Sequence, residues 1–191
     1  MATTEVMQLH SAGETPRQRF DYRGRHRYVI TVETHGGAPI FTRREIVLQV
    51  LAVLREVAFQ HHFEVHAYSF LPARLLLLVQ GKQDDSYMKG FLSAFRAAAN
   101  IQLEPGLGHP LWKRTYRERV LRKGEETTAA VREIWNTPVR ENLARHPDGY
   151  EFQGSFVKVL RTFRPGGKRP VGRSRAPSSG GKRPSFPRRP R

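Results

Sequence analysis

The segment from Phe63 to Gln80 constrains the fold more than any other part of this sequence. Its first half alternates in side-chain character as a half-buried strand does, until Leu71-Pro72-Ala73 breaks the pattern. Leu75 to Val79 then form an unbroken apolar string, which is typical of a strand buried on both faces and is too short to cross a bilayer. The sequence therefore predicts two central strands joined by a tight turn, at the centre of a soluble core.

The segments on either side predict the remaining elements. A β-branched, alternating pattern predicts a strand over 27–34. A helical stripe follows, with Thr42 as its N-cap and Glu45 completing a capping box. A second helix is predicted from Asp84 or Ser86, followed by a loop over 100–110 and an extended segment over 111–122. A last helix is predicted over 125–133, and Pro138 is expected to end or kink it. This order predicts an α+β, ferredoxin-like sandwich, with a central antiparallel sheet backed by helices on one side.

The charge of the chain is concentrated at its C-terminal end. Net charge is +16 over 191 residues, yet twelve of the 33 Lys and Arg and none of the 17 Asp and Glu follow Ser155. A stretch this rich in Pro, Gly, Ser and Arg cannot bury enough apolar surface to offset the entropy lost on ordering it. We therefore predict a flexible leader over 1–19, a folded domain over 20–155 and a disordered basic tail over 156–191.

The tail has two interpretations. One is sequence-independent contact with nucleic-acid phosphates, and the other is a solubilising end without a partner. The basic residues that would contact phosphates are Lys168, Arg169, Arg173, Arg175, Lys182 and Arg183. The tail lacks the amphipathic apolar face that would favour a membrane surface. The chain has no cysteine and no signal-peptide pattern, so a cytoplasmic protein without disulfides is expected.

Several short motifs, in this order, carry a resemblance to a known family. They are the Leu71-Pro72 turn, the segment Leu111-Trp112-Lys113-Arg114-x-Tyr116-x-x-Arg119-Val120 and the helix end Ile134-Trp135-Asn136-Thr137-Pro138-Val139-Arg140. Over about residues 20–155 the chain resembles the single-tyrosine HUH transposases, with the REP-associated tyrosine transposases as the most similar branch. The resemblance implies a homodimer that cuts single-stranded DNA at hairpin-marked ends. It also implies a Mg or Mn ion held by a His-hydrophobe-His pair, and a helix tyrosine that attacks the scissile phosphate.

The family pattern fails at these catalytic positions. Arg74 and Leu76 stand where the two metal-ligating histidines are expected, and neither side chain has a lone pair to offer. Glu133 stands where the tyrosine is expected, and a carboxylate without a metal is repelled by a phosphate. We therefore predict no metal, no cofactor and no catalytic residue, with Tyr116 and Glu133 as the fallback nucleophiles if activity persists.

Other residues are candidates for contact with DNA. Arg74 could hold a phosphate where the ion would sit, or it could point to solvent. Tyr116 could stack an unpaired base, or it could be a core anchor, which is the role favoured for Trp112. The arginines expected to follow the DNA backbone are Arg114, Arg117, Arg119 and Arg140. For His61, His62 and His66 a helix end or a solvated loop is favoured over a metal site.

Together these features predict a transposase-like protein that binds single-stranded or hairpin DNA and has lost catalysis. An alternative is an active transposase or endonuclease with a rearranged site that uses Tyr116 or Glu133. A third possibility is a decaying pseudoenzyme without a selected role, whose tail makes it adhere weakly to any DNA.

Overall fold

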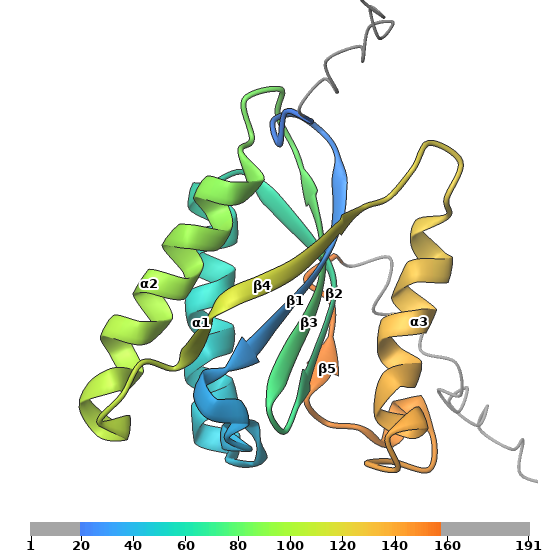
Figure 1. The fold of residues 1–191 in the computed structure, drawn as a ribbon. Coiled ribbons are helices and arrows are strands. Elements are labelled where there is room, and N and C mark those ends of the chain that lie inside the picture. Colours follow the sequence, from blue (N-terminus) through green and yellow to red (C-terminus); the bar gives the residue numbers. More distant parts are fainter. Residues whose placement is uncertain (1–19, 158–191) are drawn as a thin grey trace, which may run out of the picture.

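The computed structural model of the chain describes residues 20–157, which form one five-stranded antiparallel sheet with helices on both faces (Figure 1). The strands are β1 Arg27–Thr34, β2 Phe63–Leu71, β3 Arg74–Gly81, β4 Trp112–Val120 and β5 Gln153–Gly154, in the order β4-β1-β3-β2-β5. The α-helices are α1 Arg44–Gln60, α2 Met88–Leu107 and α3 Thr127–Arg140, and the 3₁₀ helices are η1 His35–Gly37, η2 Ile40–Thr42 and η3 Pro147–Gly149. The predicted α+β class is confirmed. The predicted leader lies outside the described residues, as does the predicted tail beyond Val157.

The two predicted central strands are β2 and β3. They pair from Phe63 opposite Gly81 to Leu71 opposite Arg74, so Pro72 and Ala73 form the turn. β3 also pairs with β1 and therefore lies inside the sheet. Leu77 contributes to the core under α1 and α2, whereas Leu78 contributes to the core under α3. The unbroken apolar string is explained by this burial on both faces, as predicted.

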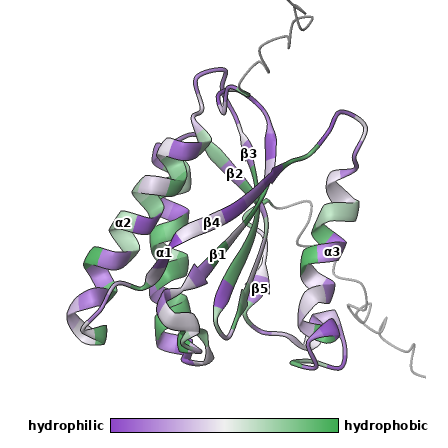
Figure 2. Ribbon diagram, in the orientation of Figure 1, coloured by the Kyte–Doolittle hydropathy of each residue, from purple (hydrophilic) through white to green (hydrophobic). Residues whose placement is uncertain are grey.

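The helices are divided between the two faces of the sheet. α1 and α2 lie side by side on one face and α3 lies alone on the other (Figure 1). The expectation that helices back one side is therefore correct for α1 and α2 and wrong for α3. The cause is a second, smaller core, to which β2 and β3 contribute Ala67 and Leu78 and α3 contributes Val131, Ile134 and Trp135. Hydrophobic colouring follows the central strands, whereas β4 is hydrophilic along much of its length (Figure 2).

All three α-helices begin or end elsewhere than predicted. α1 begins at Arg44, and Thr42 donates its hydroxyl hydrogen bond to the Pro39 carbonyl (2.8 Å), so the predicted capping box is absent. The cause is the 3₁₀ turn η2, which uses Thr42 before α1 starts. Most of the predicted loop over 100–110 belongs to α2, which ends at Leu107 before Gly108, a residue in the left-handed conformation (φ 74°).

Proline inside a helix explains the remaining differences. Pro105 removes only the hydrogen bond to the carbonyl of Ile101, a residue with an exposed side chain where water can replace the missing donor. α3 likewise continues through Pro138 and ends at Arg140. Within residues 20–157, no helix is long and apolar enough to cross a membrane.

His66 in β2 is expected to make stability depend on pH. It is buried beside a register shift in the β2–β3 pairing, and its Nε2 lies 3.0 Å from Oε1 of Gln80. Burial lowers the pKa of His66 and outweighs the Gln80 hydrogen bond and the nearby Glu64, which raise it. The unfolded chain therefore binds the proton more readily. The neutral imidazole contributes its full stability above a pH of about 6.5, and this is lost as the pH falls through the lower folded pKa.

Urea unfolding at neutral and mildly acidic pH measures this effect. The His66→Gln variant cannot titrate, so its free energy of unfolding should fall less on acidification than that of the parent chain. His62→Gln, at an exposed position, is the matched control and should behave as the parent chain does. An equal fall in all three proteins would contradict the assignment to His66.

Candidate nucleic-acid interface

A hollow of about 390 Å³ lies between the sheet and α3. Its strand wall is formed by residues of β1, β3 and β4, including Thr31, Arg74, Leu76 and Arg117. Its helix wall is formed by the last two turns of α3 and the next residue, including Glu133, Thr137, Arg140 and Glu141. We call this the α3 hollow. It is lined by Arg74, Leu76 and Glu133, the three residues that stand where the resemblance leads us to expect two histidines and a tyrosine.

Strand alternation brings the strand residues to this wall. Leu75 and Leu77 of β3 pack into the core under α1 and α2, so Arg74 and Leu76 face α3. Arg117 of β4 is opposite Thr31 of β1, which places it on the same face. The two positions that correspond to metal ligands in the resembled family therefore open into one hollow, with Glu133 on its other wall.

These residues do not fit a metal ion. A guanidinium and an isobutyl group provide no lone pair, and the nearby Glu141 carboxylate accepts a hydrogen bond from Nη2 of Arg74. Within the part of the chain that the structure describes, no group of three His, Asp or Glu side chains could hold a metal ion. No step that depends on the family's ion can be derived from this arrangement.

The cations of the α3 hollow are held by polar partners. Arg74 forms an ion pair with Glu141 and is about one-third exposed, so it lines the hollow and is not directed only to solvent. Arg140 donates from Nη2 to the Thr137 hydroxyl (2.8 Å). Arg117 donates from Nη2 to Oε1 of Glu33 (2.6 Å).

The Glu33 carboxylate, which accepts a hydrogen bond from Arg117, also binds a second cation. Lys113 donates from Nζ to Oε2 of Glu33 (3.0 Å). Lys113 and Arg117 together hold the pKa of Glu33 below its usual range, so this carboxylate is charged at neutral pH. Ion pairs this exposed contribute little to stability because solvent screens them, and a phosphate that offers the same hydrogen bonds can replace the carboxylate.

Comparison with known proteins identifies the architecture. No protein-family model matches the sequence, and no curated protein matches it either. A solved REP-associated tyrosine transposase, bound to a REP hairpin, superposes with a TM-score of 0.57 at 14% identity, covering 73% of this chain and 81% of the other. The chain has the fold of a tyrosine transposase. The crystal structure of a proposed transposase from Deinococcus radiodurans R1 matches at 22% identity with a TM-score of 0.45, covering 61% of this chain and 93% of the other.

The transposase fold separates the two fallback nucleophiles. Glu133 lines the α3 hollow, whereas Tyr116 packs against the core under α1 and α2, on the opposite face of the sheet. The Arg96 guanidinium lies 5.7 Å from the centroid of the Tyr116 ring, and burial raises the pKa of Tyr116. Tyr116 is therefore not brought together with Arg74 or Glu133. Trp112 is buried between Phe41 and Phe95, which is the core role favoured for it.

The remaining predicted residues of this transposase fold are dispersed. Arg119 donates to Oε1 of Glu125 (2.6 Å) and does not line the α3 hollow. Arg114 lines a different hollow beside the start of β4. The six predicted tail residues lie outside the described part of the chain: Lys168, Arg169, Arg173, Arg175, Lys182 and Arg183.

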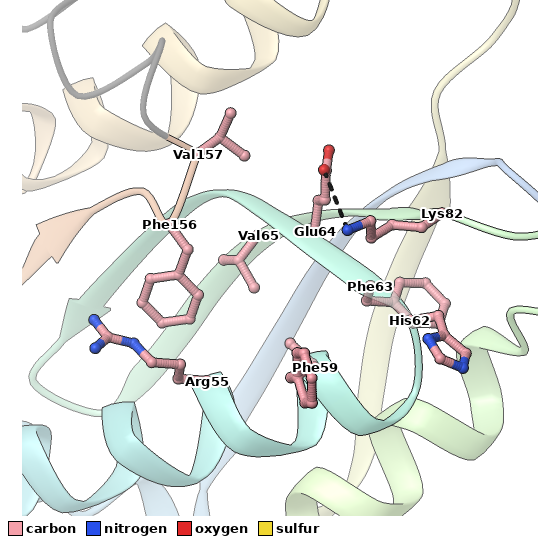
Figure 3. A pocket seen from close by; sticks show the side chains of 10 residues that line it. Arg55, Phe59, His62, Phe63, Glu64, Val65, Lys82, Phe156 and Val157 are labelled. Carbon is pink, nitrogen blue, oxygen red and sulfur yellow. Dashed lines mark ion pairs between the residues drawn. The ribbon is translucent and has the colours of Figure 1, made fainter.

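The three neighbouring histidines also lie apart. His61 follows the end of α1 with its ring 6.5 Å from that of Phe91, and His66 points toward Gln80. His62 lines a hollow of about 450 Å³ between α1 and β2, which we call the α1 hollow (Figure 3). There the Arg55 guanidinium lies 4.9 Å from the Phe156 ring centroid, and Lys82 lies 3.9 Å from Glu64.

Sequence reasoning missed several residues of the interface, Glu141 among them. Thr31 and Glu33 of β1 alternate with buried residues, and Thr137 and Lys113 lie inside the quoted motifs. The alternation of β1 was a sufficient signal for Thr31 and Glu33, because these residues alternate with the apolar residues Ile30 and Val32. No signal in the sequence pairs Glu33 with Lys113, since that contact depends on the β1–β4 register.

Proposed function

We propose that this chain is a DNA-binding member of the tyrosine transposase family, which binds single-stranded or hairpin DNA without cutting it. The observation that carries the proposal is the convergence of Arg74, Arg117 and Arg140, from three separate elements, on the α3 hollow. In the family that the chain resembles, this is the place of the metal and the scissile phosphate. The solved transposase with a REP hairpin supports DNA as the ligand.

The α3 hollow suits a phosphate. A guanidinium keeps its charge at any physiological pH and presents its N–H groups in a planar fork that matches two phosphate oxygens. Arg74 and Arg117 lie on β3 and β4, on either side of β1, and Arg140 is on the facing helix. When a phosphate lies between them, Arg74 and Arg117 would give up their hydrogen bonds to Glu141 and Glu33 and donate to the phosphate oxygens instead.

The same residues argue against cleavage. Transfer of a phosphoryl group requires an activated nucleophile and charge stabilisation that increases in the transition state. Glu133 lines the α3 hollow and stands where the resemblance leads us to expect the nucleophile. Its carboxylate would be repelled by the phosphate that it must attack. An arginine can stabilise the charge of a phosphoryl-transfer transition state, yet without an activated nucleophile its contact with the phosphate gives affinity without rate.

As parts of the same proposal, the protein acts in the cytoplasm, forms a homodimer as the resembled family does, and contacts further phosphates through its basic tail. These parts rest on the resemblance and on the composition of residues 156–191. Size-exclusion chromatography with light scattering would test the homodimer. A monomeric mass at all concentrations would contradict it.

The proposal is tested by incubating the full chain with a hairpin-bearing single-stranded oligonucleotide and Mg²⁺ or Mn²⁺. The mixture is resolved on a denaturing gel beside a native binding assay at several salt concentrations. We expect binding that weakens steeply with salt, with neither a cut strand nor a covalent adduct. An adduct lost in Tyr116→Phe or Glu133→Gln would establish the rearranged active site instead. Weak binding without preference for hairpin over random DNA would support the pseudoenzyme without a selected role.

A further inference from the structure

A second hollow adjoins the α3 hollow at the end of β1. Its volume is about 570 Å³, and it is lined by Glu33, the η1 turn His35–Gly37 and the segment 113–115 at the start of β4. We call it the η1 hollow. The two hollows meet at Glu33, because Arg117 lines the α3 hollow, Lys113 lines the η1 hollow, and the two cations bond to different oxygens of the Glu33 carboxylate.

The η1 turn leaves the backbone open on one side of this hollow. Gly36 and Gly37 both have positive φ (61° and 70°), and among the described residues no heavy atom other than those of the glycine and its two chain neighbours lies within 4 Å of the position that a Cβ would take on either residue. Side chains at these positions would be strained and would narrow the hollow, so glycine keeps the backbone accessible to a ligand. A ligand can therefore approach the main chain closely here.

Apart from the two glycines, the η1 hollow is lined by the cationic side chains of Lys113 and Arg114 and by the planar ring of His35. Lys113 and Arg114 are exposed neighbours on β4. The His35 ring is exposed at the hollow and lies 5.2 Å from the His109 ring, with 30° between their planes. Cationic side chains that track a phosphate backbone, beside rings on which bases stack, are the combination that binds unpaired nucleic acid. A paired base would not offer its face to His35.

We propose that the η1 hollow binds the nucleotide next to the phosphate held in the α3 hollow, so that a single DNA strand crosses β1 at Glu33. This inference rests on the proposed function. Lys113 and Arg114 contact the next phosphate, and the base lies against His35 above the open backbone of Gly36 and Gly37. Glu33 lies where the strand crosses β1. On binding, Arg117 and Lys113 give up their hydrogen bonds to Glu33, and each binds one of the two phosphates.

The test compares the binding of oligothymidylates of about 4 and about 12 nucleotides to full-length variants by fluorescence anisotropy, as single-strand sites span this range. Lys113→Ala combined with Arg114→Ala should weaken binding of both strands about tenfold and reduce the salt slope by about one unit, because even the shorter strand spans the two neighbouring hollows. The matched control combines Arg55→Ala with Lys82→Ala, which removes the same charge from the α1 hollow (Figure 3).

A substitution that removes the ring of His35 provides a second readout. His35→Ala should weaken the longer strand about fivefold by loss of stacking. Circular dichroism of each variant confirms folding. If both η1-hollow variants bind as the control does, the subsite is refuted while the proposed function stands. If the parent chain binds the hairpin-bearing oligonucleotide but neither strand, the subsite is likewise refuted. If it binds none of the three, the proposed function itself fails.

Discussion

Replacing Arg74, Arg117 and Arg140 together with alanine is expected to weaken the binding of hairpin-bearing single-stranded DNA on the order of a hundredfold at low salt. Arg74 and Arg117 exchange a carboxylate for the phosphate, whereas Arg140 exchanges the Thr137 hydroxyl. Together the three contribute about 3 kcal/mol, which gives this factor. The slope of log affinity against log salt should become less steep by about 0.7 unit, since the α3 hollow holds one phosphate and each phosphate contact with a single strand contributes about this much. Anisotropy titrations across a salt series measure both quantities.

A charge-matched triple variant provides the control. Arg25, Arg55 and Lys82 do not line the α3 hollow, and their replacement with alanine removes the same net charge. The DNA affinity of this control should fall only slightly, because its substitutions remove only long-range electrostatic attraction, which salt screens. If the two triple variants lose affinity equally, charge alone drives binding and the α3 hollow is not the site. Single substitutions are less decisive, because three neighbouring cations that share one phosphate do not act additively.

The central strand pair could be predicted because its signals are local. Alternation, a proline turn and an apolar string fix β2, β3 and the face that Arg74 and Leu76 share. The position of α3 could not be predicted in the same way. Its apolar stripe shows that one side of the helix is buried, yet either face of the sheet could receive it. The placement follows from the space over Ala67 and Leu78, which only the folded sheet defines.

The separation of Tyr116 from Arg117 and Arg119 was accessible from the sequence. Neighbouring residues of a strand point to opposite faces, so Tyr116 belongs with Trp112 and the arginines belong to the other side. Grouping them as one DNA-binding cluster ignored this alternation. The pairing of Lys113 and Arg117 on Glu33 was not accessible, because the β1–β4 register shifts between Val32 and Thr34. Such an irregularity depends on both strands at once.

Replacing Trp135 with alanine is expected to lower the free energy of unfolding by about 3–5 kcal/mol, as for other large aromatic side chains in a core. Trp135 is only 5% exposed and belongs to the smaller core, together with Leu78 of β3 and Ile134 of α3. A small core cannot compensate for a lost indole by repacking. Urea denaturation followed by far-ultraviolet circular dichroism measures the change.

Two substitutions calibrate that result. Trp135→Phe keeps a ring in the core and should lose less than half as much, whereas Phe59→Ala removes a side chain that is 79% exposed and should stay within about 0.5 kcal/mol of the parent. α3 also carries Glu133, Thr137 and Arg140 into the α3 hollow. Trp135→Ala should therefore weaken DNA binding even where the sheet remains folded, because one wall of the site loses its support. Full affinity in a destabilised Trp135→Ala protein would show that the strand wall binds DNA without the helix, and would place the site on β3 and β4 alone.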